Sequence, residues 1–208
     1  AAGLPPARVA VADLDRRDEL CGLVSELLED GPVHILVNNT GGPPGGPLLA
    51  ASEADFLSAF GRHVLAAHRL TGLMLPGMQE TGYGRILNIV STSVYEPIRG
   101  LGVSNTIRGA MAAWAKTLSD ELPPGVTVNN VLPGFTDTGR LASLKRERAQ
   151  RSGATQEAIH SGWLAQVPEG RLACPGEAAS AVAFLASPAA AYIRGASLPV
   201  DGGRLRGI

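Results

Sequence analysis

Residues 126–134 read VTVNNVLPG, and this stretch decides the fold class. A run rich in valine and leucine is followed at once by a Pro-Gly turn, as expected for a strand buried on both faces of a parallel sheet. Four further runs have the same character. Together with Val126–Leu132, they predict five short strands. The other four are Arg8–Ala12, Val33–Val37, Arg85–Val90 and Ser197–Val200.

Helical patterns lie between these runs. Asp15 is placed to cap a first helix that Gly31-Pro32 ends, and Ser52 is placed to open a second. Apolar side chains spaced three and four residues apart predict a third helix over Ile107–Leu122, and Pro175 begins a last one. Because strands and helices alternate, the sequence predicts a single α/β domain over residues 1–208, with right-handed crossovers and helices on both faces of a parallel sheet.

The bulk composition bounds the class of protein. The chain has 208 residues, of which 45% are hydrophobic, and this suits one domain with a sizeable core. Its formal net charge is −1 and no basic stretch stands out, so no nucleic-acid partner is expected. Without an apolar run of about 18 residues or a signal peptide, we expect a cytoplasmic protein with no membrane partner. Cys21 and Cys174 are too few for a disulfide framework, and we predict no metal site.

One segment carries little clear periodicity. Leu141–Gln166 is polar and arginine-rich, and it lies between the fourth predicted strand and the last predicted helix. Either a mobile lid or a solvated surface helix fits this pattern. Only Lys116 and Lys145 of the 18 cationic residues are lysines, and we interpret the arginine bias as a compositional trait rather than as a binding signal.

Four short strings end the predicted strands in order: VNNTG at 37–41, NIVS at 88–91, NNVLPGFTDT at 129–138 and PVDGG at 199–203. Their order and placement resemble the short-chain dehydrogenase/reductase family, in particular its 3-oxoacyl-carrier-protein-reductase-like branch. The resemblance runs from about Val9 to Gly203. It implies a Rossmann-like doubly wound fold and an NAD(P)-dependent oxidoreductase that acts on a carbonyl or alcohol of a small-molecule substrate.

A cofactor site follows from both physics and the resemblance. Ligands of open α/β sheets bind beyond the carboxyl ends of the strands. The resemblance places Asp13 beside the adenine ring and Thr138 at the nicotinamide carboxamide, and it leaves the choice between NAD and NADP open. Asn39 could instead bond neighbouring strands, and Asp13 could be a helix cap. The full set of expected cofactor-binding residues is Asp13, Asn39, Thr40, Gly41, Pro133, Gly134, Phe135 and Thr138.

The glycine-rich turn that carries the pyrophosphate in this family has no counterpart in the chain. Gly41–Gly46 is rich in glycine, but it follows the wrong strand and its prolines lack backbone donors. In the family strand order 3-2-1-4-5-6-7, two strands would separate Arg8–Ala12 from Val33–Val37. We therefore expect the first βαβ unit to be absent from this sequence and the sequence to be part of a longer chain.

The family's catalytic residues are an asparagine, a serine, a tyrosine and a lysine, and only the serine is kept, as Ser91. The tyrosine position, thirteen residues later, is Ser104, and the lysine position is Arg108. The asparagine position falls at His63. A tyrosine has a pKa of about 10, and a nearby lysine lowers it further, so a serine hydroxyl is far less acidic. An arginine does not relay protons as a lysine can.

Three interpretations follow from these replacements. In the first, Ser91, Ser104 and Arg108 polarise a carbonyl, and water, Tyr95 or His63 delivers the proton. In the second, the protein is a catalytically silent scaffold or binds a nucleotide or acyl ligand without turnover. In the third, Ser104 acts as a nucleophile, although no base-and-acid pair accompanies it. Tyr95 could equally be a loop or interface residue, and His63 a helix residue with a satisfied ring.

The resemblance also implies a homodimer or homotetramer assembled through two long helices. Phe56–Met74 and Ile107–Leu122 carry enough apolar and small residues for such contacts. Ordinary packing on the sheet would use the same residues.

Overall fold

A computed structural model describes residues 7–207, and within them a parallel four-stranded sheet forms the centre of the fold. The strands lie in the order β1-β2-β3-β4. Every neighbouring pair is parallel, so the predicted α/β architecture is confirmed. Their bounds are β1 Ile35–Asn38, β2 Gly84–Ile89, β3 Val126–Pro133 and β4 Ser197–Val200.

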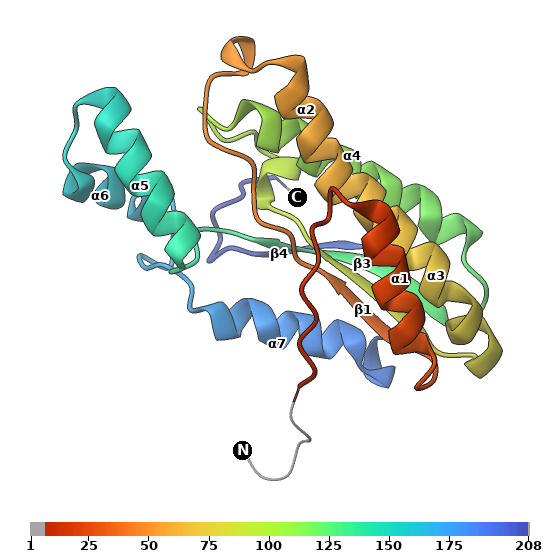
Figure 1. The fold of residues 1–208 in the computed structure, drawn as a ribbon. Helices are drawn as coiled ribbons and strands as arrows, with labels where there is room; N and C mark the ends of the chain where they lie inside the picture. Colours follow the sequence, from red (N-terminus) through yellow and green to blue (C-terminus); the bar gives the residue numbers. More distant parts are fainter. Residues whose placement is uncertain (1–6, 208) are drawn as a thin grey trace.

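Helices cover both faces of this sheet (Figure 1). One face packs against α1, α3 and α4, and the other against α7, while α5 and α6 form a pair beyond the strand ends. The helices are α1 Arg17–Leu28, α2 Glu53–Phe60, α3 Ala66–Thr81, α4 Gly102–Glu121, α5 Gly139–Ser152, α6 Gln156–Leu164 and α7 Pro175–Ala186. The short helical turns are η1 Leu48–Ala50, the π-helical η2 Gly61–Leu65, η3 Thr92–Val94 and η4 Pro188–Ala190. None of the helices in residues 7–207 has the length and apolarity that a membrane span requires.

The predicted strand over Arg8–Ala12 is wrong. This run has no strand structure, and the side chains of Val9 and Val11 are 86% and 91% exposed. A strand forms only where a neighbour supplies backbone hydrogen bonds. In residues 7–207, β1 pairs with β2 alone. The strand order that the resemblance implies would put two strands between β1 and this run.

The predicted helix starts at Ser52 and Pro175 are confirmed, and the one at Asp15 is wrong. Ser52 caps α2 in a capping box with Asp55, whose backbone N–H lies 3.2 Å from Ser52 Oγ. Asp15 does not cap α1, which begins at Arg17 with Arg16 in the cap position. The Asp15 carboxylate instead pairs with Arg62 at 2.7 Å.

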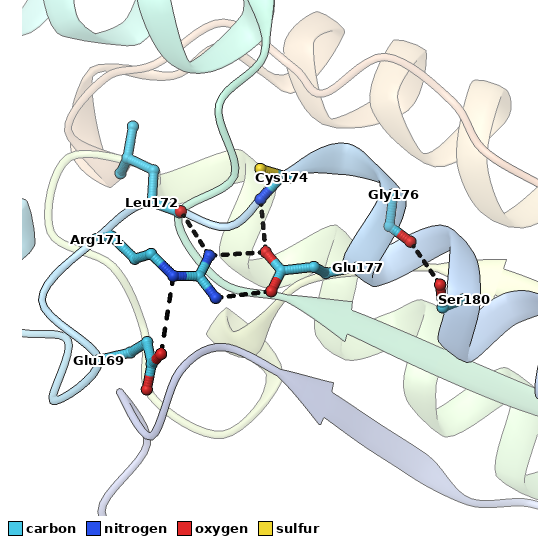
Figure 2. Close-up of polar contacts among 7 residues, drawn as sticks. All are labelled: Glu169, Arg171, Leu172, Cys174, Gly176, Glu177 and Ser180. Carbon is cyan, nitrogen blue, oxygen red and sulfur yellow. Dashed lines mark hydrogen bonds and ion pairs between the residues drawn. The ribbon is translucent and has the colours of Figure 1, made fainter.

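An ion pair fixes the start of α7 (Figure 2). Both carboxylate oxygens of Glu177 accept from Arg171, at 2.8 and 2.7 Å. One of them also accepts from the backbone N–H of Cys174, at 2.7 Å. These bonds, that of Arg171 above all, lower the pKa of Glu177 to about 2. The helix therefore begins at Pro175 with a charged acceptor in its first turn, as the macrodipole favours.

A ladder of side-chain amides crosses all four strands. Asn38 donates to Asn88 at 2.9 Å, Asn88 donates to Asn130 at 2.9 Å, and Asn130 donates to Ser197 Oγ at 3.0 Å. These residues are direct partners in the strand register. Asn88 and Asn130 are fully buried, so the ladder satisfies polar groups that would otherwise oppose folding.

Loss of the central ladder residue tests its role. Asn88→Ala leaves both the Asn38 donor and the Asn130 acceptor unpaired, and we expect it to lower the free energy of unfolding by about 2–4 kcal/mol. Asn39→Ala is the control, because Asn39 is exposed and we expect a change within about 0.5 kcal/mol. Urea denaturation at pH 7 measures both variants. Equal effects of the two substitutions would contradict the ladder's importance.

Candidate functional site

A cavity of about 980 Å³ opens at the carboxyl ends of β1, β2 and β3. Its floor is made by the residues that follow these strands, its roof by one face of α5 with Trp163 of α6, and one wall by the first turns of α7. This volume lies at the upper end of the range typical of small-molecule sites. The position agrees with the rule that open α/β sheets bind ligands beyond their strand ends.

The structure brings most of the predicted site residues together here. Ten of them line the cavity: Asn39, Thr40, Gly41, Ser91, Ser104, Arg108, Pro133, Gly134, Phe135 and Thr138. Asp13 and His63 are not among its lining residues. In residues 7–207, no cluster of three or more His, Cys, Asp or Glu side chains could hold a metal ion.

The sequence left two roles open for Asn39, a contact with the cofactor or a bond to a neighbouring strand, and the structure divides these roles between Asn39 and Asn38. Asn39 is exposed and lines the cavity, whereas Asn38 bonds the neighbouring strand. Asn38 is the last residue of β1 and Asn39 is the first residue after it, which explains the division. Asp13 does not cap α1 either, because Arg16 is in the cap position. Its carboxylate instead accepts the backbone N–H of Asp15 at 3.0 Å in the turn before that helix.

The turn after β3 needs a glycine. A Cβ on Gly134 would lie 2.8 Å from the Cα of Asp201, so no other residue fits without displacing the backbone after β4. The next residue, Phe135, stacks on Trp163 of α6 with ring centroids 5.4 Å apart. Thr138 then caps α5, its hydroxyl accepting the N–H of Leu141 at 3.3 Å. This turn thereby joins the strand end to the roof of the cavity.

Ser91 and Ser104 place two hydroxyls on the cavity wall. Ser91 follows β2 and caps the turn η3, its oxygen accepting the N–H of Ser93 at 3.1 Å. Ser104 lies in the first turn of α4 and is 9% exposed. Among residues 7–207, its hydroxyl has no hydrogen-bond partner. Both hydroxyl protons are therefore available to a ligand in the cavity.

Arg108 lies one helical turn after Ser104 and is also buried. Its guanidinium donates to the carbonyl of Ile89 at 2.8 Å and to that of Thr40 at 3.5 Å, so it bridges the ends of β2 and β1. Burial, together with the positive charge of Arg140, lowers the pKa of Arg108 to about 10. The side chain therefore stays charged at neutral pH, close to another cation.

His63 is buried in the π-helical turn between α2 and α3, behind the cavity wall. Burial and the neighbouring Arg108 lower the pKa of His63 to about 4, and a hydrogen bond with the backbone of Gly41 opposes this shift. The ring is neutral at pH 7 and does not act there as a protonated acid. Tyr95 is exposed and also does not line the cavity; its hydroxyl lies 3.4 Å from the carbonyl oxygen of Ser197.

Sequence reasoning missed the roof of the cavity. The segment Leu141–Gln166 contains most of α5 and all of α6, so the helical alternative is confirmed, but one face of α5 is directed at the site instead of at solvent. Arg140, Leu144, Arg148 and Arg151 all line the cavity. Their spacings of four, four and three residues are a helical stripe, which was the available signal.

A parallel sheet with helices on both faces and a cavity at its strand ends defines a nucleotide-binding type of α/β protein. The model of the enoyl-(acyl carrier protein) reductase family matches residues 1–204 of the chain. The 3-oxoacyl-[acyl-carrier-protein] reductase FabG of Vibrio cholerae is 39% identical over 178 residues, which are 84% of this chain and 68% of that protein. The chain therefore belongs to this family, and the resemblance to the short-chain dehydrogenases/reductases is confirmed.

Other relatives support the same assignment. The reductase MabA of Mycobacterium avium is 33% identical over 202 residues, which are 97% of this chain and 74% of that one. The crystal structure of a single-residue variant of actinorhodin polyketide ketoreductase with NADPH superposes with a TM-score of 0.87. It is 32% identical and the match covers 94% of this chain and 76% of that chain. The expectation of an oxidoreductase agrees with these names.

The buried histidine gives the fold a pH dependence. The unfolded chain takes up a proton at His63 near its ordinary pKa of 6.5, whereas the folded protein does so only near 4. Folding stability is therefore lost as the pH falls through this window. We expect wild type to lose about 3 kcal/mol more than His63→Gln between pH 7 and pH 4, as measured by urea denaturation.

A matched control for this measurement is His68→Gln, which replaces an exposed histidine on α3. Its stability should follow that of wild type across the pH range. Parallel curves for wild type and His63→Gln would show that burial of His63 does not resist its protonation.

Proposed function

We propose that this protein is an NAD(P)-dependent oxidoreductase that reduces the carbonyl of an acyl-type substrate by way of an atypical active site. The cavity carries the proposal, because it gathers Ser91, Ser104 and Arg108 beside the loops after β1 and β3. The names of the relatives, 3-oxoacyl reductases among them, support the reaction class. The ketoreductase structure with NADPH supports NADPH as the first cofactor to test.

The residues present fit the nicotinamide end of such a cofactor. The loop after β1 supplies exposed backbone at Gly41, where a side chain would meet no atom within 4 Å, so a ligand can approach closely. Thr40, Pro133 and Thr138 would hold the nicotinamide and its ribose from either side. When bound, the cofactor supplies the hydride, and the chain's own residues orient the carbonyl and stabilise the developing alkoxide.

The unusual feature of the proposed reaction is the source of its proton. The described residues that line the cavity include no Tyr, Lys, His, Cys, Asp or Glu. We infer that a water molecule, held by the Ser104 hydroxyl beside the Arg108 guanidinium, delivers the proton to the alkoxide, and that the hydroxide left behind takes a proton from bulk solvent. Ser91 donates to the same oxygen, as the family's serine does by resemblance. Arg108 contributes charge stabilisation and does not itself exchange a proton.

The same lack of an acid favours a second candidate function. A protein of this family that binds a nucleotide or acyl ligand without turnover needs no proton donor. NADPH oxidation against a panel of ketones and 3-oxoacyl thioesters separates the two. Turnover supports the oxidoreductase, whereas NADPH binding in calorimetry without turnover of any substrate supports the silent ligand-binding protein.

Restoring the usual acid tests the proposed chemistry directly. Ser104→Tyr combined with Arg108→Lys places a phenol beside an ammonium on one face of α4, and a general acid contributes about 10²–10⁴-fold to a rate. We expect the double variant to raise kcat for NADPH oxidation by about a hundredfold over wild type. Arg108→Lys alone is the control and should gain nothing. A double variant no faster than wild type would contradict a missing acid as the limiting feature.

A further inference from the structure

The roof of the cavity is strongly cationic. Arg140, Arg148 and Arg151 lie on the cavity face of α5, and Arg99 and Arg108 add two more guanidinium groups from other walls. The described lining residues include no carboxylate. The whole chain carries 18 basic and 19 acidic residues, so this concentration of one sign is local and does not reflect the overall charge.

These guanidinium groups converge without a compensating charge. Nη2 of Arg140 and Nη2 of Arg108 lie 3.4 and 3.8 Å from the point where a Cβ on Gly42 would stand. Arg140 also donates to the carbonyl of Pro43. Among residues 7–207, none of the five cavity arginines forms a salt bridge. Like charges held this close favour a bound anion between them.

The convergence continues along α5. Nη2 of Arg151 lies 3.1 Å from the corresponding Cβ point at Gly45, which is itself 3.5 Å from the carbonyl of Gly100. Arg99 precedes that glycine and also lines the cavity. Oε2 of Glu147 lies 3.4 Å from the same Cβ point, so one carboxylate stands near Arg151, although the two side chains form no ion pair. Arg99 and Arg148 have no ion-pair partner among residues 7–207, so this end of the cavity still carries an excess of positive charge.

We propose that the α5 arginines form an anion-binding wall, and that the carbonyl substrate carries a phosphate or carboxylate which Arg148 and Arg151 hold. The substrate assignment rests on the proposed function. Guanidinium groups match both anions with paired hydrogen bonds. The loops after β1 and β3 would hold the cofactor, whereas Arg148 and Arg151 belong to the opposite, roof side of the cavity, where the acyl portion would lie.

Binding is measured first without any reaction. We expect coenzyme A, which supplies phosphates, or acetoacetate, which supplies a carboxylate, to bind in isothermal titration calorimetry, and neutral pantetheine to bind at least tenfold more weakly than coenzyme A. Arg148→Gln combined with Arg151→Gln should weaken the anion by about a hundredfold, roughly tenfold for each charged hydrogen bond lost. Arg146→Gln, on the same helix but outside the cavity lining, is the control and should change nothing.

Kinetics then assign the anion to substrate or cofactor. With NADPH as the reductant, the double variant should raise KM for acetoacetyl-coenzyme A about a hundredfold, with little change in kcat. KM for the neutral acetoacetyl-N-acetylcysteamine thioester should stay as in wild type. A preference for acetoacetate over both thioesters would identify the carboxylate as the anion source.

Two outcomes would overturn the inference. Equal affinity of wild type and the double variant for coenzyme A and for acetoacetate would show that the arginines hold no anion. A raised KM for NADPH with an unchanged KM for the carbonyl compound would assign the wall to the cofactor's phosphates. Anion binding that depends on the arginines, without turnover of any carbonyl compound, would instead leave the anion site standing and remove the proposed oxidoreductase function.

Discussion

The amide ladder from Asn38 through Asn88 and Asn130 to Ser197 is the constraint on which the site depends. Hydrogen bonds between side chains on one face of a sheet fix which residue faces which, and a slip by one residue would turn them to the other face. In β1 and β2 the ladder residues, Asn38 and Asn88, are the last and the last but one of their strands, so the ladder fixes the register where these two strands end. The carbonyls of Thr40 and Ile89 consequently lie close enough together for one guanidinium to reach both.

That guanidinium links the sheet to the cavity. Arg108 fixes the ends of β1 and β2 from α4, yet it remains a buried cation with another arginine beside it. Its two carbonyl acceptors compensate part of the cost of removing the guanidinium from water, and no carboxylate among residues 7–207 forms an ion pair with it. Such a cavity is preorganised for negative charge before any ligand enters, because Arg108 and Arg140 are held in place by hydrogen bonds to backbone carbonyls.

The sequence predicts what depends on local pattern and fails where a distant partner decides. Buried strands such as Val126–Leu132 can be predicted because two-sided burial leaves a run dense in valine and leucine. Arg8–Ala12 has the same composition, but strand structure also needs a neighbour, which no local pattern reveals. The division of roles between Asn38 and Asn39 depends on where β1 ends. The arginines of α5 look solvated in sequence, and only the placement of that helix over the strand ends directs one face inward.

The replacements at Ser104 and Arg108 are consistent with one another physically. A tyrosine needs a nearby cation to lower its pKa, and once the phenol is gone, a titrating lysine has no acid to assist. An arginine in its place stays charged at neutral pH even with a lowered pKa, so it can only attract and orient negative charge. The buried histidine behind it is kept neutral partly by that same charge. The positive charge of Arg108 thus helps to keep His63 unprotonated, while it favours an alkoxide or other anion in the cavity. In the proposed reaction the proton would come through solvent or an uncharged hydroxyl, while the arginines of the cavity favour a bound anion.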